Sequence, residues 1–410
     1  MIDFSSQIPY KVGMHVSLFL CRRRLPVLLL GLLLLATAPG ACLYGQRSPS
    51  LLPLPLDSLV AFPSLPPLDT VVDGYRFFFV GEEHRHRINS RLQLAFLLYL
   101  HQRAGVRNLI VEGGYSTGFL LNQYLTTGDS GILQKVLTNI PVCPEDQMAL
   151  FRQLYHYNQA QPDSLRIRVM GIDLDHSPEL SLQVLHTLLP AEATVPQAIA
   201  PLIMRIPALH QSPYLDRGEV KRFFKRLARS LARYPEAHAQ LWGSHAARVR
   251  HLVDNTLAGY RFGLIKAMLF QRVWRTREAR MYANYLTLRP YLARGGSFAQ
   301  FGMLHTDLGP SSEWNFPTLA HRLQHRSDSP VRGDVLTISR YVSHLEERYQ
   351  TLGGIEAERL RLLVRRADAT FPGQVVLAPL LGPDSPFPRL SRSFQYILLI
   401  SPQADRSPCE

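Results

Sequence analysis

Several common functional motifs are missing from this sequence of 410 residues. It contains no P-loop, no His-Glu-x-x-His pair and no Cys-x-x-Cys motif, and it shows no internal repeat or long low-complexity tract. The commonest nucleotide-binding and zinc-protease patterns are therefore excluded. Its hydrophobic content of 46% is nevertheless ordinary for a globular protein with a large buried core.

Acidic residues are scarce, because 32 Asp and Glu stand against 45 Lys and Arg, which gives a formal charge of +13. The arginine excess is concentrated between residues 217 and 280. A basic surface can attract phosphates, nucleic acid or anionic lipid. This region lacks zinc-finger spacing and the aromatic and glycine-rich signatures of RNA-binding proteins. We therefore expect a solvated basic surface and no specific nucleic-acid partner.

No apolar run reaches the roughly 20 residues that a membrane-spanning helix needs. The stretch LPVLLLGLLLLATA at residues 25–38 follows three arginines and precedes small residues. This order is typical of a secretory signal peptide, so we assign residues 1–46 to one and expect a periplasmic or secreted protein. Cys42 follows Gly40 and Ala41, and lipid attachment at Cys42 would tether the protein to a membrane.

Two cysteines, Cys143 and Cys409, would remain in the mature chain. In an oxidising compartment they could pair as a disulfide. Free buried thiols are the alternative, and their positions along the chain do not decide between the two.

Short apolar runs alternate with helical patterns through the rest of the chain. Residues 47–70 are rich in proline, serine and leucine and indicate a linker to a domain spanning residues 71–405. Continuous apolar runs are typical of strands buried on both faces of a parallel sheet. The runs are YRFFFV (75–80), NLIV (108–111), IRVMGI (167–172), SFAQFGM (297–303), DVLTIS (334–339), VVLAPL (375–380) and QYILLI (395–400). We therefore predict an α/β fold with a mostly parallel central sheet covered by helices.

Residues 177–290 contain no convincing strand and are predicted to form an all-helical insertion in this domain. Within it, apolar residues recur at helical spacing opposite a face of lysines and arginines. These apolar residues are Phe223, Phe224, Leu227 and Leu231. Such a stripe packs on the parent domain or, as the weaker alternative, contacts a membrane. A further helix is expected over residues 88–104, with Gly105 placed to end it.

Charged side chains follow four of the predicted strands. In chain order they are Glu82 with His84, then Glu112, Asp173 and His305. Ligands of open α/β sheets bind at the carboxyl ends of the strands, so these groups should converge on one cleft. His84 could take a proton from a water that attacks a carbonyl, with Glu112 or Glu82 orienting its ring. His305 could act as the matching acid or hydrogen-bond the oxyanion.

Short motifs extend this pattern along most of the chain. Gly-Glu-Glu-His at residues 81–84 is followed by a helical segment and by Leu-Ile-Val-Glu-Gly-Gly at residues 109–114. Further motifs are FLLNQYLTTGD (119–129), VMGIDLD (169–175), REARMYANYL (277–286) and FGMLHTD (301–307). In order and spacing these motifs resemble the erythromycin esterase-like family.

The resemblance implies an α/β fold with a helical insertion and hydrolysis of a macrolide lactone without a required cofactor, as in the antibiotic-resistance enzymes of that family. The catalytic roles it implies are His84 as general base, Glu112 as its acidic partner, Glu82 as the acid of the opening motif and His305 as a second histidine. The candidates it implies for contact with a small-molecule substrate are Asp173, Tyr124, Arg277 and Glu278. No resident metal is expected under this interpretation.

Two alternatives stay open. The compact Gly-Glu-x-His spacing also resembles Tiki metalloproteases and ChaN-type haem-binding lipoproteins of the wider superfamily, which would make Glu82, His84, Asp173 and His305 ligands of a divalent metal or haem. The second alternative is a non-catalytic relative, because the histidine comes one residue sooner than in the esterases. The arginine of the family would also fall on Gln93.

Overall fold

The computed structural model describes residues 49–56, 62, 64–139, 143–191, 194–212, 216–265, 270–309, 316–341, 354–381 and 385–401. The expected signal peptide and Cys42 lie outside these residues. Cys143 is disulfide-bonded, but Cys409 also lies outside the described residues, so the pairing of these two cysteines stays a prediction. Within the described ranges, no helix combines the length and apolar character that a bilayer span requires.

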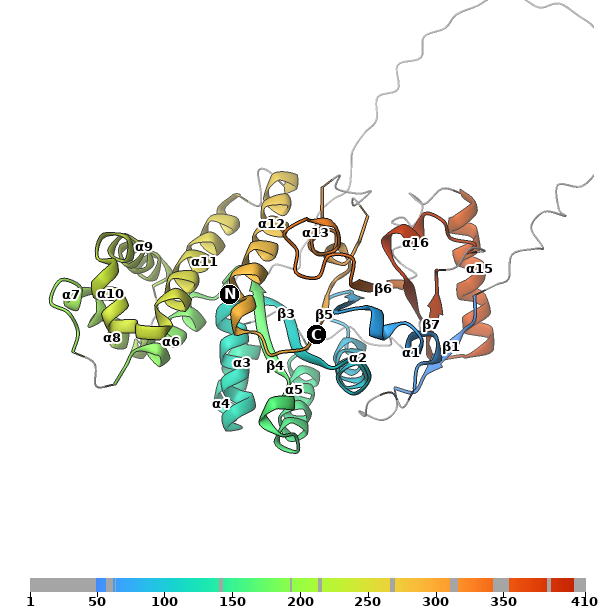
Figure 1. Cartoon of the computed structure of the whole chain (residues 1–410), viewed down its shortest axis with the longest axis horizontal. Coiled ribbons are helices and arrows are strands. Elements are labelled where there is room, and N and C mark those ends of the chain that lie inside the picture. Colours follow the sequence, from blue (N-terminus) through green and yellow to red (C-terminus); the bar gives the residue numbers. More distant parts are fainter. Residues whose placement is uncertain are drawn as a thin grey trace, which may run out of the picture. The chain divides into compact units, whose positions relative to one another are not determined.

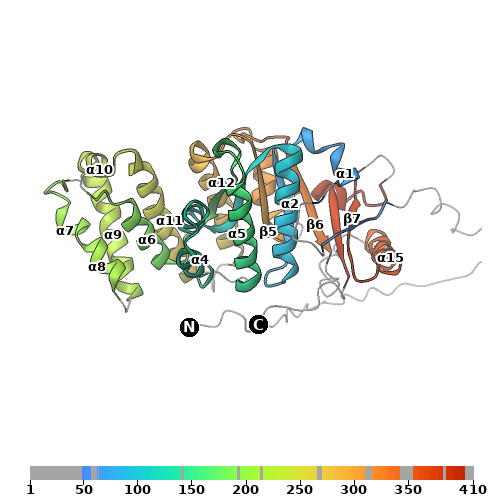
Figure 2. The same ribbon diagram turned by 90° about the horizontal axis from the view of Figure 1, so that it is seen from below.

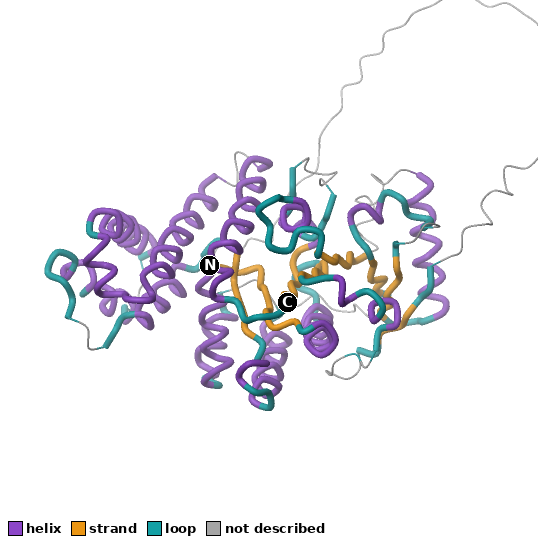
Figure 3. Tube along the Cα trace, viewed as in Figure 1, coloured by secondary structure: helices purple, strands orange, loops and turns teal. Residues whose placement is uncertain are grey.

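One eight-stranded sheet forms the centre, in the order β1-β7-β8-β6-β2-β5-β3-β4. β7 runs antiparallel to its neighbours β1 and β8, and all other neighbouring pairs are parallel. The strands are β1 (Leu52–Leu54), β2 (Phe77–Glu82), β3 (Val106–Gly114), β4 (Arg168–Asp173), β5 (Gly296–Gly302), β6 (Val335–Tyr341), β7 (Val375–Pro379) and β8 (Tyr396–Ile400). The prediction of a mostly parallel sheet is confirmed, and Figure 3 shows the strands among the helices that flank them.

Helices cover both faces of this sheet. Figures 1 and 2 show α2 and α5 on one face and α12 on the other. The helices outside the insertion are α1 (Pro66–Asp69), α2 (Ile88–Ala104), α3 (Tyr115–Thr127), α4 (Ser130–Leu137), α5 (Pro144–Gln159), α13 (Leu319–His325), α15 (Gly354–Thr370) and α16 (Leu390–Ser393). Short 3-10 helices are η2 (Val72–Gly74), η3 (Asp163–Leu165) and η6 (Met303–His305). α2 ends where Gly105 takes a φ of 63°, a left-handed conformation that costs glycine little.

The predicted insertion contains helices and no strand in its described part. Its elements are α6 (Pro178–Leu188), α7 (Ala200–Ile203), α8 (Arg205–Gln211), α9 (Arg217–Arg233), α10 (Pro235–Trp242), η4 (Gly243–His245), α11 (Ala246–Ile265) and α12 (Phe270–Leu288), with η5 (Arg289–Tyr291) after it. In Figures 1 and 2, α6 to α11 lie beside the β4 end of the sheet and α15 lies beside the other end. The apolar stripe of α9 is buried, so it packs inside the protein.

The central strands are buried on both faces, which explains their continuous apolar runs. Phe77 and Phe79 of β2 are fully buried, and their rings stack with centroids 4.6 Å apart. Phe301 of β5 meets Phe79 edge to face at 6.0 Å. Burial of a phenylalanine side chain contributes about 1.5–3 kcal/mol, so this cluster fixes the strands that carry the site.

The segment described from sequence as a linker, residues 47–70, is partly folded. Its three-residue strand β1 pairs antiparallel with β7, and Leu54 is buried. Pro53 is tolerated because β1 is the edge strand, where a residue can face outward without a partner for its backbone nitrogen. A Leu-Pro-Leu strand is too short for alternation to reveal it, and its proline argues for a loop.

Asparagine side chains close the outer edge of β4, which pairs with no further strand among the described residues. Asn122 of α3 accepts the N–H of Val169 at 2.8 Å and donates to the carbonyl of the same residue. Asn158 of α5 makes both bonds with Ile167, at 2.9 and 2.8 Å. These amides replace the bonds of a neighbouring strand, so Asn122 and Asn158 have a structural role.

Candidate active site

The carboxyl ends of β2, β3, β4 and β5 meet beside α12, and each brings an ionisable side chain. Glu82 ends β2, Glu112 lies in β3, Asp173 ends β4, and His305 lies in η6 directly after β5. Arg277 and Glu278 come from α12. The pairing of β3 with β4 shifts register between Val111 and Gly114, and such irregularities redirect side chains near functional sites.

His84 lies at the solvent-facing side of this cluster. Its Nδ1 is 2.9 Å from Glu82 Oε1, and because an ionised carboxylate only accepts hydrogen bonds, Nδ1 carries the proton. Nε2 is therefore the basic atom of the neutral ring. Glu82 is held in turn by Gln300 of β5, whose Nε2 donates to Glu82 Oε2 at 2.8 Å and to the carbonyl of Asn89 at 2.9 Å.

The residue after His84 has a conformation that favours glycine. Arg85 takes a φ of 66°, in the left-handed region. A non-glycine residue there is uncommon and costs about 1–2 kcal/mol.

Glu112 is the centre of the cluster. Its Oε1 lies 2.8 Å from Arg277 Nη2, 3.2 Å from His305 Nε2 and 3.9 Å from His84 Nε2. Its Oε2 accepts the backbone N–H of Gly302 at 2.8 Å. Burial alone would raise the pKa of Glu112, but the charges of His305, His84 and Arg277 outweigh it and hold that pKa well below its usual range. Glu112 is therefore a carboxylate in the resting protein.

The guanidinium of Arg277 lies between the carboxylates of Glu112 and Asp173 and binds both. Its Nη2 and Nε bind Asp173 Oδ2 and Oδ1 at 2.6 and 3.0 Å. The guanidinium also lies over the ring of Trp274, 4.9 Å from its centroid. Burial would raise the pKa of Asp173, but Arg277 lowers it overall. Two carboxylates and an aromatic face thus compensate the buried guanidinium.

His305 is held between two carboxylates. Its Nδ1 is hydrogen-bonded to Glu278 Oε1, and its Nε2 faces Glu112. The other oxygen of Glu278 accepts the N–H of Leu319 at 2.6 Å, at the start of α13. Burial lowers the pKa of His305, but Glu278 and Glu112 raise it to about 10. Its side chain is 3% exposed, so it is a buried imidazolium with both nitrogens engaged.

The sequence-predicted residues divide into an accessible group and a buried group. His84 is 54% exposed, and Glu82 and Glu112 reach solvent to a smaller extent, at 17% and 13%. Asp173 and Glu278 are each 2% exposed. Asp173 binds Arg277 and Glu278 binds His305 in this arrangement, and their contact with a substrate stays a prediction.

Tyr124 does not join the cluster. It lies more than two turns along α3 from the start of that helix at Tyr115. Its ring is buried and packs 5.8 Å from that of Tyr155 in α5. Tyr124 therefore belongs to the core and lies apart from the cluster, and its contact with a substrate stays a prediction.

Both ring nitrogens of His305 face carboxylates. An acid or oxyanion donor needs an N–H that faces the substrate. In this arrangement His305 contacts Glu112 and Glu278, and its part as an acid or oxyanion donor stays a prediction.

A Gly-x-Ser-x-Gly pattern at residues 114–118 was missed by the sequence reasoning. Ser116 lies at the turn from β3 to α3, where serine hydrolases place their nucleophile. Here Ser116 is 1% exposed, and its N–H and Oγ both donate to the buried Asp175. Asn255 of α11 donates to the other oxygen of Asp175 at 3.0 Å. Within the described residues no histidine bonds Ser116, so this trio joins the start of α3, the segment after β4 and α11 without forming a nucleophile.

Gln300 was missed as well, and the sequence does carry a signal for it. It is the one amide in the run SFAQFGM, whose other members are apolar or small apart from the leading serine. A polar residue inside a strand that is buried on both faces must find partners. Its partners are Glu82 and Asn89.

The metal alternative requires residues that are already engaged. Asp173 is bound by Arg277, and both nitrogens of His305 face carboxylates. No group of three or more His, Cys, Asp or Glu side chains in the described part of the chain is arranged to hold a metal ion. Ligation by these residues would need Arg277 to leave the space between the carboxylates.

Comparison with known proteins shows the fold. A histidine-to-asparagine mutant of erythromycin esterase EreC, in its open conformation, is 13% identical and has a TM-score of 0.57, with 85% of this chain and 97% of that chain covered. A protein of succinoglycan biosynthesis has a TM-score of 0.58 at 15% identity, with 86% and 94% covered. A Bacillus cereus protein has a TM-score of 0.54 at 15% identity, with 85% and 95% covered.

No protein-family model matches the sequence, and no curated protein does. The chain shares its fold with these three structures. At such low identity the likeness extends to the fold alone.

Proposed function

We propose that this protein is an exported hydrolase that adds water to an ester or lactone carbonyl, with His84 as general base. The observation that carries the proposal is the arrangement of Glu82, His84 and Glu112. One carboxylate binds Nδ1 of the exposed ring, and the other lies 3.9 Å from its free Nε2.

A water can bridge the gap between His84 Nε2 and Glu112 Oε1. The 3.9 Å separation is too long for a direct hydrogen bond, but a water beside the line that joins the two atoms could lie about 2.8 Å from each of them. Glu112 would orient this water as an acceptor, while Nε2 removes its proton. A positioned general base contributes about 10²–10⁴ in rate.

The reaction balances with the groups present. The water oxygen bonds to the carbonyl carbon as its proton passes to Nε2. The imidazolium then returns that proton to the departing alkoxide oxygen as its bond to the carbonyl carbon breaks. Glu82 supports the charged ring in both steps because it remains bonded to Nδ1.

Macrolide lactones are the first substrates to test, because the structure most relevant to this chemistry is that of erythromycin esterase EreC. Export is supported by the signal-like N-terminus and by the disulfide at Cys143, since such bonds persist in oxidising compartments.

The direct experiment incubates the purified protein with erythromycin and with a panel of p-nitrophenyl esters, and follows the gain of one water by mass spectrometry. His84→Ala should lower turnover at least about 100-fold. His86→Ala is the matched control, because His86 lies in the same loop and its Nε2 faces Glu83 at 3.3 Å. The proposal fails if no substrate is hydrolysed or if the His84 variant equals the wild type. Metal analysis and a visible absorption scan on the same preparation test the metal and haem alternatives.

A further inference from the structure

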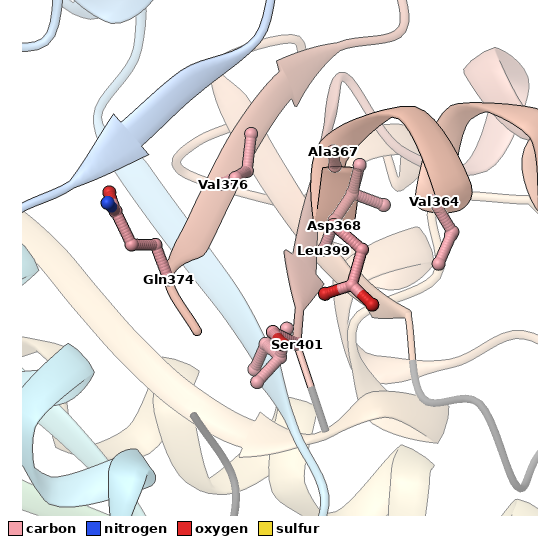
Figure 4. Close-up of a pocket in the computed structure, with 8 residues that line it drawn as sticks. Val364, Ala367, Asp368, Gln374, Val376, Leu399 and Ser401 are labelled. Atoms are coloured by element: carbon pink, nitrogen blue, oxygen red, sulfur yellow. The ribbon is translucent and has the colours of Figure 1, made fainter. Parts of the chain in front are cut away.

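A large hollow lies away from the proposed active site. It has a volume of about 590 Å³ and runs beside α3 and the first residues of β4, with α11 and η5 on its other side. Pockets for small molecules are about 300–1,000 Å³. A much smaller hollow between α15, β7 and β8, shown in Figure 4, has about 10 Å³ and has room for little more than a single water.

The larger hollow is not a groove for an added strand. It follows the outer edge of β4, where an extended peptide could otherwise pair with the backbone. Asn122 already uses both backbone groups of Val169, and Asn158 those of Ile167. A ligand there must therefore be recognised through side chains.

Those side chains are basic and aromatic. Arg168 of β4 and Arg248 of α11 line the hollow, and the described residues place no carboxylate within ion-pair distance of either. Asp163, which also lines it, is paired with Arg166 at 2.8 Å. Tyr291 of η5 lies under the guanidinium of Arg248, 5.3 Å from the ring centroid to Cζ. The lining thus carries two uncompensated positive charges.

Unused hydrogen-bonding groups surround the same hollow. Tyr115 is 3% exposed, and its hydroxyl lies near the guanidinium of Arg248, which lowers the pKa of Tyr115 against the larger effect of burial. Nε of Arg248 and the side-chain oxygen of Gln123 have no hydrogen-bond partner among the described residues. Buried polar groups are normally satisfied by protein, water or ligand. Two such atoms around one hollow indicate a ligand with polar groups of its own.

We propose that this hollow binds a small organic anion with a flat apolar body, such as an aromatic sulfonate, carboxylate or phosphate. Arg248 and Arg168 would meet the anionic group. Tyr115, Phe119 and Tyr291 would contact the apolar body. This site is independent of the hydrolase proposal, because its lining includes neither His84 nor Glu112.

Two dyes with a common aromatic body test the inference. Anilinonaphthalene sulfonate carries an anionic group, and N-phenylnaphthylamine lacks it. Fluorescence titration of the full chain should show saturable binding of the sulfonate. Arg248→Gln should weaken it about tenfold and leave the neutral dye almost unchanged, because only the charge-assisted contact is lost.

Matched controls separate this site from general surface binding. Arg250 lies two residues further along α11, is exposed and does not line the hollow. Arg250→Gln and His84→Ala should therefore bind the sulfonate like the wild type. Circular dichroism checks that each variant is folded. The inference is overturned by absent or non-saturable sulfonate binding, by equal effects of Arg248→Gln and Arg250→Gln, or by equal loss of both dyes in the Arg248 variant.

Discussion

His84 should make the hydrolase reaction strongly dependent on alkaline pH. The charge of Glu112 and the hydrogen bond that His84 donates to Glu82 raise the pKa of His84 to about 9. With that pKa, about 1% of the ring is neutral at pH 7 and about half is neutral at pH 9. Only the neutral ring can accept the proton of water. We therefore expect kcat/KM to increase up to about 50-fold between these two pH values, and less where solvent screens the half-exposed ring.

The perturbation that tests this origin is Glu112→Gln, because Glu112 is the largest cause of the shift. Its removal should move the midpoint of the kcat/KM profile downward, toward the ordinary histidine pKa of 6.5. Glu83→Gln is the matched control, since Glu83 faces His86 rather than His84. The assay is hydrolysis of an active ester followed from pH 6 to pH 10, with an NMR titration of the His84 ring as a second readout. A wild-type midpoint near 6.5, or equal midpoints in both variants, would refute the reasoning.

Three further outcomes follow from the same contacts. A Cβ at Gly302 would lie 3.0 Å from His84 Nε2, so Gly302→Ala should lower kcat about 10–100-fold by displacing the ring or its water, with a melting temperature close to that of the wild type. Asn122→Leu removes both partners of the Val169 backbone, and urea denaturation should show a loss of about 2–4 kcal/mol. The folded-state pKa of His305, about 10, lies above its ordinary value of 6.5, so its contribution to stability is complete below that value and is lost as pH rises toward 10. The pH dependence of the melting temperature should therefore be flatter in His305→Asn above pH 7, and an unchanged slope would contradict this assignment.

Much of the sheet could be predicted because the central strands are buried on both faces and read as unbroken apolar runs. The same reasoning fails for β1, which has three residues and contains Pro53. Its position is decided by pairing with β7, a contact between segments more than 300 residues apart in the chain. The pattern of apolar residues within a short segment does not show which distant strand that segment pairs with.

The sequence was enough to predict which residues lie in the cluster, but not what each of them can do there. Acidic and imidazole groups at four strand ends identified Glu112 and His305 as neighbours, because parallel strands end at one edge. Burial decides what each can do, and it depends on which helix covers which residue. His305 is enclosed by Glu278 of α12 and by the start of α13, so its ring contacts carboxylates in this arrangement. Gln300 shows the converse case, since a neutral amide gives no sign of acid–base chemistry but holds Glu82 in place.

The helical insertion completes this site rather than merely adjoining it. Asn284 of α12 donates to the carbonyl of Ile172 at 2.8 Å, and Asn255 of α11 donates to that of Asp173 at 2.7 Å. Arg277 precedes Asn284 by seven residues, or about two helical turns on the same side of α12. These anchors therefore set where the guanidinium meets its carboxylates.

Anchoring of this kind has a consequence for mutagenesis. Removal of Arg277 would take away the main partner of the buried Asp173 and one of the cations around Glu112, and breaking a buried ion pair costs about 3–5 kcal/mol. Loss of activity in such a variant would report on folding as much as on chemistry. The exposed His84 and its partner Glu82 have no such burden, because solvent can replace the contacts they lose. Variants at these two positions are therefore the ones whose kinetics can decide whether this cluster catalyses a reaction.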